Sequence, residues 1–232
     1  MHLFYGTYQE SYILLSEAET HHLSKVLRLK EGDEVLASTG DGKVYNGRIK
    51  LISKKQTLIE KDAVYKEESE KNVKLSIGVG ILKTNERLEW LLEKATELGV
   101  SQIHLLQTER TERNKINPER LQKIITAACK QSLKGRIPSL VAPQKFIDFV
   151  KTHAATEQKF IAHCQQWDLS PLKHQLKSGL NTVLLIGPEG DFTEKEVTDA
   201  EASGFKSCGL GKERLRTETA AIVAVVTVKN TI

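Results

Sequence analysis

The sequence predicts an α/β protein with a small β-barrel at its N-terminus and a mostly parallel sheet in the rest of the chain. Strand-like segments and a glycine turn signal fill residues 1–65, and a polar stretch that we interpret as a linker follows at 66–72. From residue 73 onward, strands alternate with helices, which predicts a parallel sheet covered by helices on both faces. We therefore expect two domains, at residues 1–68 and 73–232.

The first 65 residues have the pattern of a small barrel. Gly40, Asp41 and Gly42 form a hairpin turn signal, and a helix is expected around residues 17–27. Short segments with strand propensity surround these features, at residues 2–6, 33–39, 43–53 and 56–62.

The remainder of the chain alternates between strands and helices. We expect strands at residues 73–81, 101–106, 158–162 and 182–186, and helices at 85–98, 170–178, 193–202 and 219–228. Asn117 and Pro118 have the residue types of an N-cap and a first helical position, which predicts a further, basic helix. Thr193 and Glu196 have the spacing of a capping box at the start of the helix expected at 193–202. Gly99 is expected to end the helix at 85–98. The buried stripe of helix 85–98 comprises Leu88, Leu91, Leu92, Ala95 and Leu98.

Two glycine-rich loops lie near the C-terminus. GPEGDF at residues 187–192 and GLGKERLRTETA at residues 209–220 each follow an expected strand and open an expected helix. Glycine lets the backbone turn tightly or lets a ligand approach closely. Loops at the carboxyl ends of strands are where open α/β sheets bind ligands. Both loops could be tight turns only, but the charged residues Glu189, Arg216 and Glu218 favour a site.

The composition is that of an ordinary globular protein, because 39% of its 232 residues are hydrophobic and 28% are charged. No apolar run reaches the roughly 18 residues of a membrane helix and no secretory leader is visible, so we expect a cytoplasmic protein. The cysteines are widely spaced, which indicates reduced thiols, and the adjacent His21 and His22 lack the spacing of a metal site. These cysteines are Cys129, Cys164 and Cys208.

The net charge of +4 is concentrated in the middle of the chain. Residues 110–136 hold 8 lysines and arginines against 2 acidic residues. Helical spacing places four cations on one face of the basic helix, beside an inward apolar face. A charged face is usually only solvated surface, but a single sign of charge favours a surface that binds RNA phosphates. The four cations are Arg120, Lys123, Lys130 and Lys134, flanked by Arg110, Arg113 and Arg136, and the apolar face comprises Leu121, Ile124, Ile125 and Ala128.

Several motifs, in the same order along the chain, resemble the RsmE family of the SPOUT class of RNA methyltransferases. The two glycine loops resemble the family's pair of cofactor motifs. KATELGV at residues 94–100, AACKQS at 127–132 and HHLSKVLR at 21–28 resemble further family motifs, so the resemblance covers nearly the whole chain. The chain departs from the family pattern at Asp191, where a small residue is frequent, and at Arg214, where isoleucine is frequent.

The resemblance implies a PUA-like RNA-binding barrel followed by an α/β methyltransferase domain that carries a trefoil knot. The implied activity transfers a methyl group from S-adenosylmethionine to N3 of a uridine in 16S ribosomal RNA, without a metal. The implied partners are 16S ribosomal RNA or the assembling small ribosomal subunit, and a second copy of the chain in a homodimer.

For the implied reaction, the positions and charges of the residues suggest individual roles. Arg216 is the candidate for stabilising the uracil anion, and Glu189 or Glu218 for accepting the proton from N3. For Glu218 an equal alternative is a purely structural role, because an acid at the start of a helix is favoured by the helix dipole. The expected cofactor-binding residues are Gly187, Pro188, Gly190, Leu210, Gly211, Leu215 and Thr219. The expected RNA-binding residues are Lys25, Arg28, Arg110, Arg113, Arg120, Lys123, Lys130, Lys134 and Arg136.

Two other functions compete with this interpretation. Nucleotide hydrolysis is disfavoured, because the phosphate-binding pattern G-x-x-x-x-G-K-[ST] does not occur and Glu189 would repel a phosphate. A non-catalytic RNA-binding ribosome assembly factor would explain the basic helix and the barrel equally well. Tight binding of S-adenosylmethionine separates that alternative from an enzyme.

Overall fold

The computed structural model describes residues 1–68, 73–113, 115–166 and 168–231. The chain forms two compact units, of which the first comprises residues 1–72 and 126–137 and the second comprises residues 73–125 and 138–232. The sequence pattern does not anticipate that residues 126–137 belong with the N-terminal part. Sequence reasoning uses local periodicity as its signal, and contacts between distant segments produce no such periodicity.

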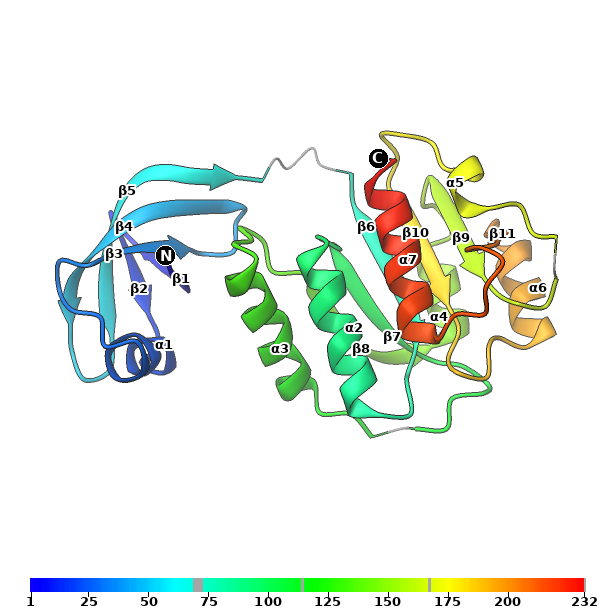
Figure 1. The fold of residues 1–232 in the computed structure, drawn as a ribbon, viewed down its shortest axis with the longest axis horizontal. Helices are drawn as coiled ribbons and strands as arrows, with labels where there is room; N and C mark the ends of the chain where they lie inside the picture. Colours follow the sequence, from blue (N-terminus) through cyan, green and yellow to red (C-terminus); the bar gives the residue numbers. More distant parts are fainter. Residues whose placement is uncertain (69–72, 114, 167, 232) are drawn as a thin grey trace. The chain divides into compact units, whose positions relative to one another are not determined.

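Five strands of the first unit close into a barrel in the order β1-β2-β5-β4-β3 (Figure 1). Strands β1 and β3 run parallel, and the other neighbouring pairs are antiparallel. Phe4, Ile13, Val35, Ile49 and Ile59 are buried in its interior, so the predicted small barrel is confirmed. The strands are β1 (Leu3–Gln9), β2 (Tyr12–Leu15), β3 (Glu34–Ser38), β4 (Lys43–Ile52) and β5 (Thr57–Glu67).

The helix expected over residues 17–27 is confirmed only in its first half. The regular helix α1 (Glu17–His21) is capped by the hydroxyl of Ser16. The chain then continues as a π-helical turn, η1 (His22–Val26), after which the N–H of Leu27 donates to the carbonyl of His22 at 3.0 Å. Leu23 within this turn is fully buried in the barrel core.

Two further features of the first unit differ from the prediction. Strand β2 was not predicted, because it has only four residues and follows a turn in which Glu10, and no glycine, adopts positive φ (55°). The linker predicted at residues 66–72 is wrong at its start, because Lys66 and Glu67 belong to β5 and pair with Val44 and Lys43. Residues 69–72 lie outside the described residues.

Six parallel strands form the sheet of the second unit, in the order β11-β9-β10-β6-β7-β8. Every residue of β6 and β10 is buried, as expected for strands that are covered on both faces. The predicted parallel sheet is therefore confirmed. The strands are β6 (Leu75–Gly80), β7 (Gln102–Gln107), β8 (Ser139–Lys145), β9 (Gln158–Ala162), β10 (Thr182–Ile186) and β11 (Lys206–Cys208).

The helices that lie wholly in the second unit are α2 (Asn85–Glu97), α4 (Phe146–Thr152), α5 (Leu172–Gln175), α6 (Glu194–Ala202) and α7 (Thr217–Lys229). Helix α3 (Pro118–Gln131) begins in the second unit and ends in the first. Helices α4 and α6 share a buried cluster with Val183, Leu185 and Phe192. Helix α7 contacts α2, β6 and β10.

Three predicted helix ends agree with the structure. Thr193 and Glu196 form the capping box of α6, and each side chain bonds to the other residue's backbone N–H. Asn117 accepts the N–H of Arg120 at the start of α3, with an N–O distance of 3.1 Å. Gly99 follows α2 with φ 79°, a conformation that glycine adopts at low cost.

The prediction fails at two places in this unit. Strand β8 and helix α4 were not predicted, because β8 is half-exposed along its length and contains Pro143. The helix predicted at 170–178 shrinks to α5, because the backbone at Leu176 is already extended (ψ 143°). The trefoil knot stays a prediction. Among the described residues, no helix has the length and apolar character needed to span a membrane.

Candidate functional site

The first glycine loop, residues 187–192, follows β10 and is packed closely against its surroundings. Gly187 and Pro188 are buried. A Cβ added to Gly80, at the end of β6, would lie 2.5 Å from the backbone nitrogen of Pro188. The N–H of Asp191 donates to the carbonyl of Pro188 at 2.9 Å, and Asp191 adopts φ 63°. The loop is therefore a tight turn whose shape depends on glycine in the neighbouring strand.

Side-chain contacts hold this loop from three directions. The carboxylate of Glu189 accepts the backbone N–H of Lys83 at 3.1 Å. The guanidinium of Arg110 donates to the carbonyl of Gly190 at 2.6 Å. The carboxylate of Asp191 accepts the N–H of Cys164, in the loop after β9, at 2.8 Å. The protein thus fixes this loop by its own contacts.

The second glycine loop, residues 209–216, follows β11 and is more open. Gly209 is held at its base, where its carbonyl accepts the N–H of Leu172 at 3.0 Å. Gly211 adopts φ 138°, and a Cβ placed there would meet no atom within 4 Å. Residues 211–214 are exposed, whereas Leu210 and Leu215 are half-buried.

The start of α7 brings a buried acid next to this second loop. Arg216 is the N-cap residue of α7 and is exposed, with no side-chain partner among the residues that the structure describes. Glu218 is only 8% exposed, and its Oε2 atom is buried without a hydrogen-bond partner in the described part of the chain. A buried carboxylate oxygen without a donor is costly, so a ligand that brings a donor would be favoured here.

Arg87 on α2 connects the two carboxylates that the sequence analysis proposed separately. Its NH1 atom lies 3.8 Å from Oε1 of Glu189, and its Nε atom lies 3.7 Å from Oε1 of Glu218. This cation was missed by sequence reasoning. The available signal was its position in the first turn of a helix that follows the carboxyl end of β6.

A buried histidine after β9 joins β11 through a chain of hydrogen bonds. Nδ1 of His163 accepts the N–H of Gln165 at 3.3 Å, so the proton resides on Nε2, which donates to Ser207 at 2.9 Å. Ser207 in turn donates to Glu201 at 2.6 Å. Burial lowers the pKa of His163, which favours this neutral form. With this polarity the imidazole donates to the serine, so it cannot act as a base that removes the serine proton.

The basic residues expected to bind RNA fall into both units, and several already have partners within the chain. In the second unit, Arg120 forms an ion pair with Glu89 at 2.6 Å, which raises the pKa of its guanidinium. Arg113 donates to Asn85 at 2.5 Å, whereas Lys123 is exposed. In the first unit, Lys130 forms an ion pair with Glu19. Also in the first unit, Lys25 and Arg28 are exposed, and Lys134 and Arg136 are half-buried.

The predicted cationic helix face is wrong at its end. Helix α3 stops at Gln131, and Leu133 adopts φ 51°, so Lys134 lies beyond the helix. The predicted inward face is confirmed for Leu121, Ile125 and Ala128, which are buried, and Ile124 is half-buried. Helical spacing therefore cannot assign Lys134 to the same face as Arg120, Lys123 and Lys130.

Two protein-family models and a set of related proteins match this chain. A model described as an RNA methyltransferase domain matches residues 69–229, and one described as an RNA methyltransferase PUA domain matches residues 15–62. Ribosomal RNA small subunit methyltransferase E of a Synechocystis species is 32% identical over 93% of this chain and 72% of its own length. The chain belongs to the ribosomal RNA small subunit methyltransferase E family.

Solved structures agree with this family membership. A probable rRNA-methyltransferase from Porphyromonas gingivalis is 31% identical, with a TM-score of 0.88 over 100% of this chain and 98% of its own. The ribosomal RNA small subunit methyltransferase E of Neisseria gonorrhoeae, solved with bound S-adenosyl methionine, is 25% identical, with a TM-score of 0.84 over 99% of this chain and 97% of its own. The family fold of a PUA barrel and a parallel-sheet methyltransferase domain therefore extends over the whole chain.

Proposed function

We propose that this protein transfers a methyl group from S-adenosylmethionine to N3 of a uridine in 16S ribosomal RNA. Family membership supports methyl transfer to ribosomal RNA, and the matched cofactor motifs support the cofactor. The observation that carries the proposal is a buried, unpartnered carboxylate oxygen of Glu218 beside an open glycine loop, within the described residues. The N3 position rests on the resemblance to the family alone.

The residues of the two glycine loops fit this cofactor. At Gly211 the absence of a side chain leaves the backbone open to a ligand, and φ 138° is a conformation in which an L-residue is strained. When bound, S-adenosylmethionine supplies an activated methyl group, whereas the protein supplies binding and orientation. The described residues include no group of three or more His, Cys, Asp or Glu that could hold a metal ion. The residues that would hold the cofactor are Gly187, Pro188, Gly190, Leu210, Gly211, Leu215 and Thr219.

Methylation at N3 requires that uridine lose its N3 proton. Glu218 suits the acceptor role, because its buried Oε2 has no partner in the part of the chain that the structure describes. Glu189 suits a structural role, because its Oε1 already accepts the N–H of Lys83. We therefore assign proton acceptance to Glu218 and the anchoring of the first glycine loop to Glu189.

The uracil anion that forms needs a positive charge near its carbonyl oxygens. Arg216 is exposed at the end of the second glycine loop and is not engaged by other described residues. A guanidinium stays protonated and presents a planar fork of donors to an oxygen. Arg216 would thus stabilise the anion, while Arg87 provides a charge partner for Glu218 at 3.7 Å.

The variants Glu218→Gln and Glu189→Gln test these assignments as a matched pair, since each removes one charge from the same ion-pair cluster around Arg87. Loss of a general base typically slows a reaction by about 100-fold or more, so Glu218→Gln should do this in single-turnover methyl transfer at saturating cofactor and RNA. Glu189→Gln should weaken cofactor binding and leave the saturated rate closer to normal.

Equal loss of the saturated rate in both variants would refute the assignment. A wild-type protein that binds RNA but neither binds S-adenosylmethionine nor methylates RNA would instead support the assembly-factor alternative.

We further propose that the barrel at residues 1–68 binds RNA and that residues 73–232 perform the chemistry. The substrate would be 16S ribosomal RNA or the assembling small ribosomal subunit, in the cytoplasm. Among the cations expected to bind RNA, Lys25 and Arg28 in the first unit and Arg110, Arg120 and Lys123 in the second unit are exposed. Lys134 and Arg136 in the first unit are half-buried and, like Arg110, Arg113, Arg120 and Lys130, also interact with other groups of the protein.

A homodimer is proposed from the surface of α7. The helix is apolar along most of its length, yet Val226 is 36% exposed. Trp90 on the adjoining helix α2 is 43% exposed. A helix that is hydrophobic on every side is normally covered, and a second copy of the chain would cover it. Sedimentation equilibrium should give twice the mass of 26.0 kDa, and Val226→Lys should shift the protein toward the monomer. A wild-type monomer at micromolar concentration would refute the proposal.

A further inference from the structure

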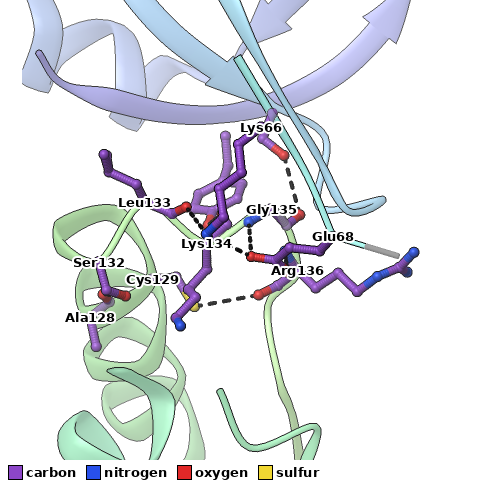
Figure 2. A network of polar contacts seen from close by, with 11 residues as sticks. Lys66, Glu68, Ala128, Cys129, Ser132, Leu133, Lys134, Gly135 and Arg136 are labelled. Atoms are coloured by element: carbon purple, nitrogen blue, oxygen red, sulfur yellow. Dashed lines mark hydrogen bonds and ion pairs between the residues drawn. The ribbon is translucent and has the colours of Figure 1, made fainter. Parts of the chain in front are cut away.

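Glu68, an acidic residue of the first unit, binds the backbone of a basic segment. The segment comprises residues 133–136, which follow α3 (Figure 2). The two carboxylate oxygens of Glu68 accept the N–H groups of Gly135 and Arg136, at 3.0 and 3.2 Å. Lys66 pairs with the same carboxylate at 3.3 Å and donates to the carbonyl of Leu133 at 3.2 Å. A carboxylate that accepts two backbone N–H groups fixes both peptide planes.

The barrel also holds the carbonyls of Lys134 and Gly135 in this segment. The hydroxyl of Tyr5 donates to the carbonyl of Lys134 at 2.6 Å. The N–H of Gly42 donates to the carbonyl of Gly135 at 3.1 Å, and Ser38 donates to the same carbonyl at 3.3 Å. Burial raises the pKa of Tyr5, so its hydroxyl keeps the proton that it donates.

Close packing leaves this segment little freedom. A Cβ at Gly135 would lie 2.5 Å from the carbonyl oxygen of Gly42, so only glycine permits the approach. Leu133 packs against the buried cluster of Leu3, Leu36 and Val44, although its φ of 51° is unfavourable for leucine. The backbone positions from which Lys134 and Arg136 project are therefore set by the barrel.

We propose that Glu68 is a positioning residue for RNA binding, because it fixes the backbone from which Lys134 and Arg136 reach RNA phosphates. The inference rests on the proposed function as an RNA methyltransferase. The expected change in RNA affinity is opposite to the usual effect of removing a negative charge. Removing a negative charge from a protein that binds RNA ordinarily strengthens binding, whereas removing this one should weaken it.

The variants Glu68→Gln and Glu67→Gln provide the test, with transcribed 16S ribosomal RNA as the probe. The neighbouring Glu67 is a matched control, since it pairs with Lys43 at 3.4 Å and its side chain is 58% exposed. Both variants remove one negative charge. Glu67→Gln should bind RNA as tightly as wild type or more tightly, whereas Glu68→Gln should bind roughly tenfold more weakly, the loss expected for one or two phosphate contacts.

The salt dependence of binding separates positioning from general destabilisation. If Lys134 and Arg136 lose their phosphates, the slope of log affinity against log salt should become shallower by about 1 to 2 in Glu68→Gln. Glu68→Asp, which keeps the charge but shortens the reach, should show the same change. The affinity for S-adenosylmethionine should equal that of wild type in each variant.

Two results would overturn the inference. The first is that Glu68→Gln binds RNA as tightly as Glu67→Gln does. The second is that Glu68→Gln binds RNA more weakly but with the same salt slope as wild type. A wild-type protein that shows no salt-dependent RNA binding would instead contradict the proposed function itself.

Discussion

The first glycine loop is packed against its surroundings, whereas the second has open space around Gly211. In the first loop, glycine serves close approach, since a Cβ on Gly187 would lie 3.0 Å from the Cα of Asp191, and one on Gly80 would collide with Pro188. In the second loop, Gly211 meets no neighbour, and glycine serves its positive φ. The two glycine-rich loops therefore contain glycine for different physical reasons.

This difference indicates how the two loops would respond to a ligand. The first loop is preformed by Glu189, Arg110 and Asp191, so it should offer the same shape with and without the cofactor. The second loop has fewer contacts around residues 211–214, which are exposed, and its shape should depend more on the ligand. Preformed parts of a site reduce the entropy cost of binding.

Gly80→Ala should produce the largest effect, because it displaces the preformed loop. Its Cβ would lie 2.5 Å from the nitrogen and the Cδ of Pro188, and neither atom can move without moving the backbone. Overpacking of this kind costs about 1–3 kcal/mol in unfolding free energy. Movement of the loop should lower affinity for S-adenosylmethionine by about 100-fold or more, which corresponds to about 2.8 kcal/mol. Chemical denaturation and calorimetric titration measure the two quantities.

The control for this change is Gly179→Ala, where a Cβ meets no atom within 4 Å. It should lower stability by about 1 kcal/mol through its φ of 79° and leave cofactor affinity unchanged. Normal cofactor affinity in Gly80→Ala would show that the first loop is not part of the cofactor site.

Arg216→Lys should have an intermediate effect that is confined to the reaction rate. The lysine keeps the charge but loses the planar fork of the guanidinium. Single-turnover methyl transfer should slow by roughly 10- to 100-fold, a loss of about 1.4 to 2.8 kcal/mol. Because Arg216 is exposed, thermal stability and cofactor affinity should stay near wild type. Weaker RNA binding with a normal saturated rate would instead identify Arg216 as an RNA anchor.

Asp191→Gly should have the smallest effect, because two changes oppose each other. Glycine relieves the positive φ of 63° but removes the hydrogen bonds from Cys164 and Phe192, at 2.8 Å each. The relieved φ contributes about 1 kcal/mol and each lost hydrogen bond costs about 1 kcal/mol, so the unfolding free energy should fall by only about 1 kcal/mol. Cofactor affinity should fall only a few-fold, since Glu189 and Arg110 still hold the loop. A loss as large as that of Gly80→Ala would show that Asp191 is the main tether.

Local signals in the sequence predicted the elements that depend on local physics. The strand at residues 182–186 agrees with β10 because five consecutive residues are buried, and a short continuous apolar run is typical of a strand covered on both faces. The capping box at Thr193 was visible because its two partners are three residues apart. Strand β8 lacks such a signal, since it is half-exposed and interrupted by Pro143.

Contacts between distant segments could not be predicted from the sequence. The ion pairs of Arg120 with Glu89 and of Lys130 with Glu19 join residues 31 and 111 positions apart. A pattern of positive charge therefore overstates how many cations are available to RNA. The same limit hid Arg87, whose role depends on two carboxylates that lie far along the chain.

The two edges of the parallel sheet differ from its interior strands in a way that affects association between molecules. An exposed strand edge is a template for pairing with another chain and thus for aggregation. At one edge β11 has only three residues, which begin with an exposed lysine. At the other edge β8 contains Pro143, which has no N–H to donate, and its register shifts there. Each edge is thereby a poor partner for a second sheet, so the sheet's hydrogen bonding should end within one molecule even when the protein is concentrated.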